Sequence, residues 1–283
     1  MSQQPGFYRR FLGDVTVTAL NDGTLDVPIT TLTGIPQAEA AALLAARFLP
    51  PAPRITVNAF LLQGHGRTIL VDTGGGGMAP TTGQMLSNLR AAGVQPDEVD
   101  LVLLTHLHSD HSGMLAQAGA AVFPRAELAL SAIDAAFWLD EASVAAAPES
   151  RRASHAAARA AVAPYPDRTR LLSPGAAAPG ITMVPLPGHT PGHSGYRVEG
   201  GGESLLIWGD IMHVPAVQAA RPEATVIYDL DPAEAAATRR RVLDMAAAER
   251  MLVAGMHLDF PALAHVTRAG DAYALVPETW SPG

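Results

Sequence analysis

Three histidines and one aspartate lie within the six residues 106–111 of the chain. The apolar run 100–104 before them predicts a buried strand, and the stretch 112–116 after them predicts the start of a helix. Imidazole and carboxylate groups are ligands of borderline divalent metals such as zinc. Without a metal, side chains packed this densely would repel one another or lose solvation. The motif therefore predicts a metal site at the end of a strand.

The direction of the side chains divides this motif into two parts. His106 and His108 are one pleat apart, so both are expected to project to the same side of the chain. Asp110 and His111 lie beyond the bend and are expected to aim at a neighbouring point. This geometry predicts two adjacent metal positions rather than one.

Three later strands, predicted over 181–186, 204–208 and 251–254, are each followed by a further potential ligand. These ligands are His189, Asp210 and His257. A lone buried histidine is more often a satisfied polar group of the core than a ligand. The prediction depends instead on the recurrence, because strand ends on one rim of a layered fold converge in space.

The predicted strands form two groups, 14–130 and 170–276, each with helices. This order favours an α/β architecture in which two sheets pack between helix layers. Two alanine-rich helices within about 132–163 interrupt the strand pattern and are interpreted as an insertion that covers another part of the molecule. No low-complexity linker divides the chain, so residues 1–283 are predicted to form one domain.

Two glycine-containing segments are interpreted as loops. The segment 21–23, Asn-Asp-Gly, predicts the turn that ends a strand over 14–20. The glycine run 74–77 could cradle a phosphate, but the Gly-Lys-Ser/Thr of a nucleotide loop does not follow it. Close approach of the backbone to a site explains this run better.

The composition excludes several classes of function. The chain has 19 basic and 27 acidic residues, a formal net charge of −8, which disfavours nucleic acid as a partner. The absence of cysteine excludes disulfides, thiolate ligands and cysteine nucleophiles. The first residues lack an apolar signal core, and no stretch approaches the roughly 18 apolar residues of a membrane span. We therefore expect a cytoplasmic protein without a membrane segment.

The motif 106–111, followed by His189, Asp210 and His257, resembles the signature of the metallo-β-lactamase superfamily. The segments 187–193 and 208–213 are similar to the methyl parathion hydrolase branch, which is related to the N-acyl homoserine lactonases. The resemblance implies an αββα sandwich, in which helices flank two mixed β-sheets and a dinuclear metal site lies between the sheets. It also implies a homodimer.

The resemblance assigns a role to each donor. Each metal takes three ligands of its own: His106, His108 and His189 for one, and Asp110, His111 and His257 for the other. Asp210 would bridge the metals, and Asp72 would orient a ligand histidine. Asp110 and Asp210 are the implied catalytic residues. Two divalent ions are expected, with zinc as the first candidate, although the same ligands accept manganese, iron or cobalt.

The implied function is hydrolysis of lactones or esters by a hydroxide that bridges the metals, with promiscuous hydrolysis of organophosphate triesters. Small molecules are therefore the expected partners. The metal motif also leaves open a glyoxalase II-like thioesterase. It further leaves open a degenerate metal-binding scaffold without activity, which the complete set of seven ligands disfavours. RNA processing uses the same motif, but the acidic charge balance argues against it.

Met78, Trp138 and His213 are predicted to line the substrate pocket. Methyl parathion hydrolases line their leaving-group pocket with aromatic side chains, and Trp138 matches one of those positions. Met78 stands where the family can carry an aromatic, which favours lactones or simple esters over aryl phosphotriesters. Packing within the core is the alternative role for Trp138.

Four other histidines are weighed separately. His193 and His213 are interpreted as satisfied polar groups of the core, with contact to substrate or to a ligand as the alternative. His65 and His155 are predicted to lie at the surface.

Overall fold

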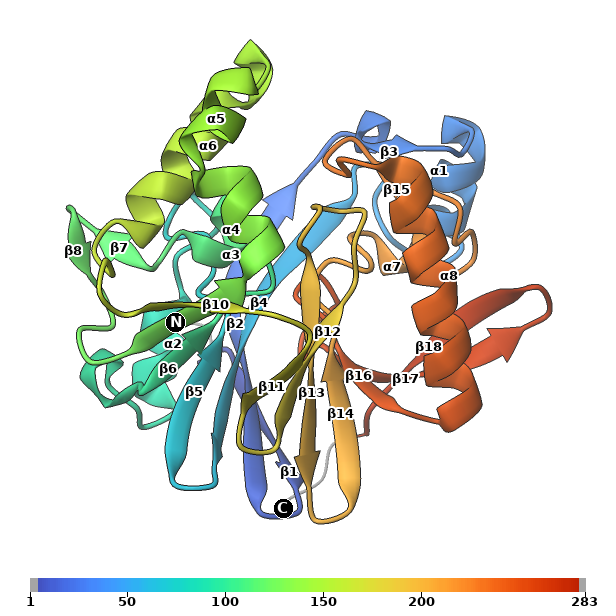
Figure 1. Cartoon of the computed structure of the whole chain (residues 1–283). Coiled ribbons are helices and arrows are strands. Elements are labelled where there is room, and N and C mark those ends of the chain that lie inside the picture. The colour runs from blue at the N-terminus through green and yellow to red at the C-terminus, as the bar shows by residue number, and fades with distance from the viewer. Residues whose placement is uncertain (1–4, 280–283) are drawn as a thin grey trace.

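The computed structural model describes residues 5–279 and contains two seven-stranded sheets that face each other (Figure 1). The strands of the first sheet, in spatial order, are β1 (Phe7–Leu12), β2 (Val15–Asp26), β4 (Arg54–Gly64), β5 (Arg67–Val71), β6 (Leu101–Leu103), β9 (Glu127–Ser131) and β10 (Thr169–Leu172). Strands β5, β6, β9 and β10 are parallel neighbours, and the other pairs of this sheet are antiparallel.

The second sheet is mixed as well, because β14 and β16 are parallel and its other pairs are antiparallel. Its strands, in order, are β11 (Gly175–Ala178), β12 (Ile181–Pro185), β13 (Ser194–Gly200), β14 (Glu203–Ile207), β16 (Leu252–Ala254), β17 (Leu263–Ala269) and β18 (Ala272–Pro277). Two short pairs complete the strands: β3 (Leu32–Thr33) with β15 (Thr225–Val226), and β7 (Ala116–Gln117) with β8 (Ala120–Ala121).

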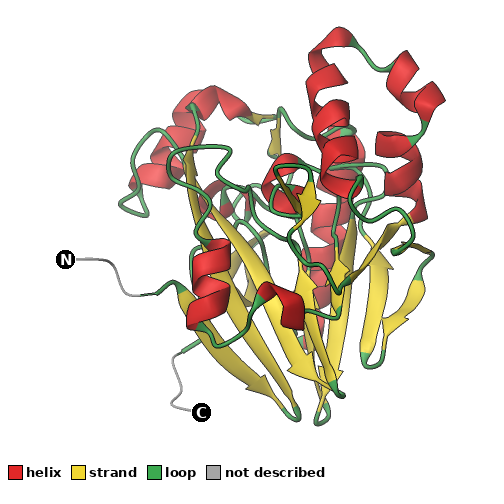
Figure 2. Cartoon of the chain, turned by 90° about the vertical axis from the view of Figure 1, so that its left-hand side faces the viewer, coloured by secondary structure: helices red, strands yellow, loops and turns green. Residues whose placement is uncertain are grey.

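Helices cover the outer faces of the sheets and gather at one end of the strands (Figure 2). They are α1 (Gln37–Ala45), α2 (Met85–Ala91), α3 (Ser109–Ser112), α4 (Ala132–Leu139), α5 (Glu141–Ala146), α6 (Glu149–Val162), α7 (Pro215–Gln218) and α8 (Pro232–Glu249), with short 3₁₀ turns at Ile29–Thr31 and Pro96–Glu98. Helix α8 begins directly after Asp231, whose side chain accepts from the Glu234 N–H and so caps the first turn. No helix in the described residues is long and apolar enough to cross a bilayer.

The central strands β4, β5, β6 and β9 are buried on both faces because both faces of the first sheet are covered. In β5, Ile69 and Val71 belong to the core between the sheets, whereas Leu70 packs in a second core with Met85 and Leu89 of α2. Such strands read as continuous apolar runs rather than as an alternating pattern. The predicted αββα sandwich is confirmed.

Two glycine-containing hairpins fix the register of neighbouring strands. His65 and Gly66 join β4 to β5, and both have positive φ angles of 52° and 73°. Gly201 and Gly202 join β13 to β14 with φ angles of 58° and 84°. Positive φ at both central residues is the type I′ geometry that matches the twist of antiparallel strands. His65 lies at the surface as expected.

The prediction that 21–23 ends a strand is wrong. Strand β2 continues to Asp26 past an irregularity between Asn21 and Gly23, and pairs with β4 along its length. Asp22 is buried, and its carboxylate accepts hydrogen bonds from the backbone N–H groups of Gly75 and Met85, both 2.9 Å long. The segment therefore forms a bulge that ties β2 to the loop after β5.

In the two large sheets, two strands were absent from the sequence-based prediction, and one was assigned to the wrong group. Strand β1 pairs with β2, and β11 pairs with β12. Strand β10 lies in the first sheet, parallel to β9, so the sheets divide after Leu172 rather than before it.

Helices are present in the segment predicted as an insertion, and α5 and α6 rise above the edge of the first sheet (Figure 1). One stripe of α6 packs against the body, with His155 and Ala158 each 1% exposed. Nδ1 of His155 donates to the Trp138 carbonyl oxygen over 3.3 Å, and the two rings pack 4.8 Å apart. The prediction of a surface position for His155 is wrong, because the helix turns this residue toward Trp138.

Candidate metal centre

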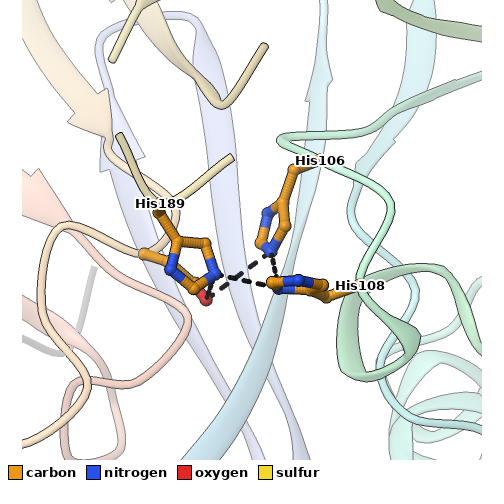
Figure 3. A group of neighbouring side chains, drawn as sticks. His106, His108 and His189 are labelled. Atoms are coloured by element: carbon orange, nitrogen blue, oxygen red, sulfur yellow. Dashed lines mark hydrogen bonds and ion pairs between the residues drawn. The ribbon is translucent and has the colours of Figure 1, made fainter. Parts of the chain in front are cut away.

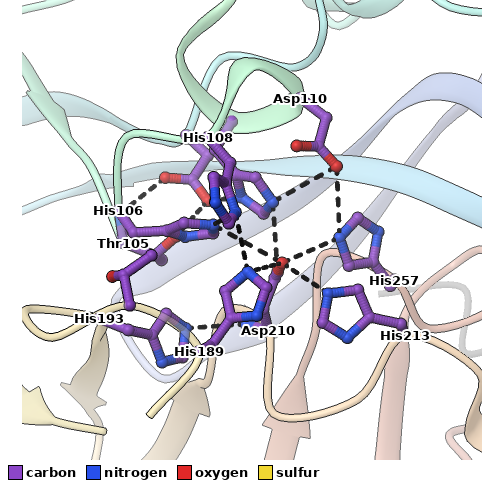
Figure 4. A network of polar contacts seen from close by, with 12 residues as sticks. Thr105, His106, His108, Asp110, His189, His193, Asp210, His213 and His257 are labelled. Carbon is purple, nitrogen blue, oxygen red and sulfur yellow. Dashed lines mark hydrogen bonds and ion pairs between the residues drawn. The ribbon is translucent and has the colours of Figure 1, made fainter. Parts of the chain in front are cut away.

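The predicted ligands lie at one end of the two sheets because the strands that carry them end there. Strand β6 leads into the motif 106–111, β12 leads to His189, β14 leads to Asp210, and β16 leads to His257. Figure 4 shows these side chains converging around the carboxylate of Asp210. Four strand ends, which are spread over residues 106–257 of the chain, thus supply one cluster.

Three imidazoles form the first group of donors (Figure 3). Nδ1 of His108 lies 3.0 Å from Nε2 of His106 and 2.9 Å from Nε2 of His189. Oδ2 of Asp210 lies 3.1 Å from Nε2 of His189 and 3.6 Å from Nε2 of His106. One donor atom from each of these four residues lies within 4.8 Å of the others, so the group could hold one cation.

Asp110, His111 and His257 form the second group, again with donor atoms within 4.8 Å of one another. Oδ2 of Asp110 lies 3.7 Å from Nε2 of His111 and 3.5 Å from Nε2 of His257. Asp210 reaches this group as well, with Oδ1 3.2 Å from His111 Nε2 and Oδ2 3.2 Å from His257 Nε2. Its carboxylate therefore lies between the two groups.

His193 holds the backbone that carries Asp210. The Asp210 N–H donates to Nε2 of His193 over 2.9 Å, and Nδ1 of His193 donates to the Leu186 carbonyl over 2.7 Å. Burial, together with the nearby His189, lowers the pKa of His193 to about 3, so its ring stays neutral and can accept. Gly209 has φ +58°, and a Cβ there would lie 2.3 Å from His193 Nε2, so a larger residue does not fit.

Hydrogen bonds on the far side of each ring decide which nitrogen faces the centre. Asp72, buried at the end of β5, accepts from Nδ1 of His111 over 2.7 Å and from the Thr105 hydroxyl over 2.7 Å. Oγ1 of Thr105 in turn accepts a hydrogen bond from the Nδ1–H of His106 over 3.1 Å. Asp72 thus orients His111 directly and His106 through Thr105.

His189 and His257 are oriented in the same way. Nδ1 of His189 donates to Oδ1 of Asp229, and Nδ1 of His257 donates to the Thr56 carbonyl, both over 2.8 Å. With Nδ1 occupied, each ring presents Nε2 to the cluster. His108 is the exception among the five imidazoles, because it presents Nδ1.

The electrostatics of the cluster couple the carboxylates to the imidazoles. Burial opposes the charge of Asp210, but His111 and His257 hold its pKa well below the usual range. Burial and the neighbouring His189 lower the pKa of His108 to about 3. Burial also opposes protonation of His189, but the Asp210 and Asp229 carboxylates raise its pKa to about 9. An ionised carboxylate among imidazoles is a donor set suited to divalent cations.

Two buried atoms in the cluster favour bound cations. In the described part of the chain, Nε2 of His111 and Oδ1 of Asp210 are buried without a hydrogen bond. Buried polar atoms are rarely left without a partner, and each exception calls for a ligand or another explanation. Both atoms face the centre of the donor groups, so the residues present fit a pair of metal ions.

The helix predicted to begin at Ser112 instead ends there. Helix α3 spans Ser109–Ser112, and the His108 carbonyl accepts from the N–H groups of His111 and Ser112. This single turn follows the strand at once, and it directs Asp110 and His111 toward the second group while His108 still faces the first.

A cavity of about 500 Å³ opens above the cluster. The predicted pocket residues Met78, Trp138 and His213 all line it. Trp138 is 1% exposed and lies edge-on to His108 with ring centres 5.3 Å apart, so it packs in the core and bounds the cavity as well. Nε2 of His213 lies 3.1 Å from Oδ2 of Asp210, and this contact with a donor matches the alternative role considered for it.

Some residues of the site were not predicted from the sequence. Asp229 and Tyr228 lie in the loop after β15, and Asp229 meets His189 from forty positions away in the chain. No spacing pattern marks a residue in such a loop. Five apolar wall residues were missed as well, namely Leu25, Val27, Ile55, Ile227 and Leu230.

Comparison with known families gives a match to the metallo-beta-lactamase superfamily over residues 52–257, which is most of the chain. The chain belongs to the metallo-beta-lactamase superfamily. The predicted superfamily is therefore confirmed. A crystal structure described as the hydrolase AbOPH in the beta lactamase superfamily is 35% identical, with a TM-score of 0.95, and the alignment covers 99% of this chain and 100% of that one.

Two further relatives extend the comparison. AidC, described as a dizinc quorum-quenching lactonase bound to its product, has a TM-score of 0.91 over 98% of each chain, and its identity of 24% shows a shared fold. A probable metallo-hydrolase of Mycobacterium tuberculosis is 31% identical over 127 residues, which are 43% of this chain and 39% of that protein. The chain thus matches about two fifths of the length of this curated relative.

Proposed function

We propose that the protein is a dinuclear metal-dependent hydrolase that cleaves lactones or carboxylic esters, with weaker activity on phosphotriesters. One observation carries the proposal: two groups of donors meet at Asp210 on the floor of a cavity of about 500 Å³. The superfamily relatives named above, which are described as hydrolases or as a lactonase, support the same reaction class.

The seven predicted ligands would hold the two cations, one in each donor group, with Asp210 shared between them. Two divalent cations supply a water of lowered pKa and a Lewis acid for the carbonyl or phosphoryl oxygen. Zinc is our first candidate, because zinc favours imidazole and carboxylate ligands. Asp72, Asp229 and Thr105 keep the rings in the tautomers that bind a cation.

Asp110 is the residue placed to move a proton. Its side chain is 19% exposed, and it lines the cavity as well as belonging to the second donor group. Burial opposes its charge, but His111 and His257 lower its pKa, so Oδ2 starts ionised. During hydrolysis the oxygen of water bonds to the acyl carbon and the bond from that carbon to the leaving oxygen breaks. Asp110 takes the proton of the water and returns it to the leaving oxygen.

The walls of the cavity support an ester or lactone with an apolar chain. Leu25, Val27, Ile55 and Ile227 line one part of it. Tyr228 adds a second aromatic ring to the lining of the cavity, but Met78 leaves the loop after β5 without one. Such walls suit aliphatic acyl groups better than flat aryl groups, which gain most from stacked aromatic partners.

A substrate panel tests the proposal. We expect kcat/KM for γ- and δ-lactones or simple esters to exceed that for paraoxon-type triesters, with glutathione thioesters last. A glutathione thioester carries several charges, whereas within residues 5–279 the cavity is lined by a single arginine and no lysine. The highest value for the thioester would establish a glyoxalase II-like enzyme. No turnover of any substrate by metal-loaded protein would favour a scaffold without activity.

Replacement of Asp229 by asparagine should weaken metal binding without unfolding the protein. The amide keeps a hydrogen-bond acceptor for His189 Nδ1 but removes the charge that supports this ring. Loss of such a partner lowers metal affinity by about 10- to 100-fold, which competition with a chromogenic chelator measures. Asp231→Asn serves as the control, because asparagine also caps a helix and this residue only caps α8. Equal affinity in both variants would contradict the role given to Asp229.

The homodimer and the cytoplasmic location implied above stay predictions, as does the single domain over 1–283. Light scattering coupled to gel filtration measures the molar mass in solution and so tests the homodimer directly.

A further inference from the structure

Arg151 occupies an unusual position on α6. His155, Ala158 and Val162 form the buried face of α6. Residue 151 is the next position on this face toward the start of the helix. At Arg151 this face of the helix no longer packs against the core. Arg151 is half-buried and lines the cavity above the candidate metal centre. The helix therefore directs a cationic side chain toward the space where substrate would lie.

The guanidinium of Arg151 has no carboxylate partner in the described residues. None of the ion pairs within residues 5–279 involves it, whereas Arg159 on the same helix reaches Glu141 of α5 at 4.0 Å. Ser150 and Ser154 line the cavity beside it and add two hydroxyl groups. This wall is polar and cationic.

We propose that Arg151 binds an anionic group, a carboxylate, that the substrate carries away from its scissile ester bond. The inference rests on the proposed function and deepens it, because it names a substrate class: esters or lactones with an acidic group on the acyl side. A planar guanidinium pairs with a carboxylate through two parallel hydrogen bonds, which gives both affinity and orientation. The serine hydroxyls would complete the shell of donors.

The arrangement of the cavity determines how such a substrate would lie. The scissile group sits on the floor, beside Asp110 and Asp210. Helices α5 and α6 stand on one side of the rim and the β3–β15 pair stands on the other (Figure 1). Ile227, directly after β15, belongs to the apolar part of the wall. An acyl chain can therefore pass the apolar wall and turn its charged end toward α6.

The test compares two esters of equal length. One is the p-nitrophenyl monoester of suberic acid, whose chain ends in a carboxylate, and the other is its neutral carboxamide counterpart. The quantity measured is the ratio of kcat/KM for the acid to that for the amide, with the full-length metal-loaded protein. Arg151→Gln should lower this ratio by about 10- to 100-fold, the effect of losing one charge-assisted contact. Arg151→Glu should instead favour an ω-amino ester.

Arg152→Gln is the matched control, because its neighbouring side chain on α6 is exposed and lies outside the cavity. This variant should keep the wild-type ratio, and an equal fall in both glutamine variants would overturn the proposal. So would a wild-type protein that hydrolyses both esters equally well.

Calorimetric binding of suberate in the same variants separates this proposal from the hydrolase itself. Weaker binding to Arg151→Gln alone, with neither ester hydrolysed, would support the anion site and overturn the hydrolase. Equal binding to all variants would overturn the anion site.

Discussion

Asp210→Asn is expected to lower kcat/KM for the best substrate by at least about a thousandfold, because metal ions in such sites supply several kcal/mol of transition-state stabilisation. Asp210 contacts both donor groups, with oxygens 3.1 to 3.2 Å from His189, His111 and His257. No other side chain in the described residues reaches both groups so closely. An amide carries no charge and offers one oxygen, so both sites should weaken together.

The metal content of the purified variant provides a second measurement. The wild-type protein should contain close to two first-row metals per chain, and Asp210→Asn should contain clearly fewer. Asp244→Asn is a suitable control, since Asp244 is an exposed carboxylate on α8 paired with Arg268. Full metal content together with full activity in Asp210→Asn would refute the shared role. Circular dichroism establishes that each variant is folded.

His106→Ala combined with His108→Ala should abolish hydrolysis while the protein stays folded. These rings supply two of the three imidazoles of the first group, and Asp110, His111 and His257 do not depend on them. We therefore expect the metal content to fall from about two ions per chain to about one. The proposed mechanism needs both positions, because a pair of metals would stabilise the attacking and the leaving oxygen together.

Unfolding measurements distinguish this outcome from general damage. The double variant should unfold cooperatively, with a lower Tm because a bound ion that stabilises the folded state has been lost. His65→Ala is the control, since His65 lies exposed in a hairpin loop. Persistent hydrolysis in the double variant would place the active site elsewhere.

The candidate site shows where sequence reasoning succeeded and where it failed. His106, His108 and Asp110 were predicted as donors because their spacing after an apolar strand is a local pattern. His155 was predicted to lie at the surface, but α6 turns it onto Trp138. Residues 21–23 have the composition of a turn, yet the pairing of β2 with β4 continues through them. Tertiary contacts override local propensity in both cases.

Asp229 and Arg151 illustrate a second kind of failure. Asp229 follows a two-residue strand and orients His189 through one hydrogen bond, a relation that no spacing pattern encodes. Arg151 is one of three arginines on α6, and only the position of that helix over the cavity separates it from Arg152. Charge and residue type were visible in the sequence, but the direction of the side chains was not.

The sequence by itself predicted the fold class, the seven candidate donors and the division of the motif into two parts. These properties follow from apolar runs that end in ligands, and strand formation and side-chain alternation are governed by nearby residues. Only the tertiary structure decided which ring nitrogen faces the centre, which groups orient it and what lines the cavity. Each of these depends on contacts between distant segments, such as Asp72 with His111 and Thr56 with His257, and the packing of the two sheets sets those contacts.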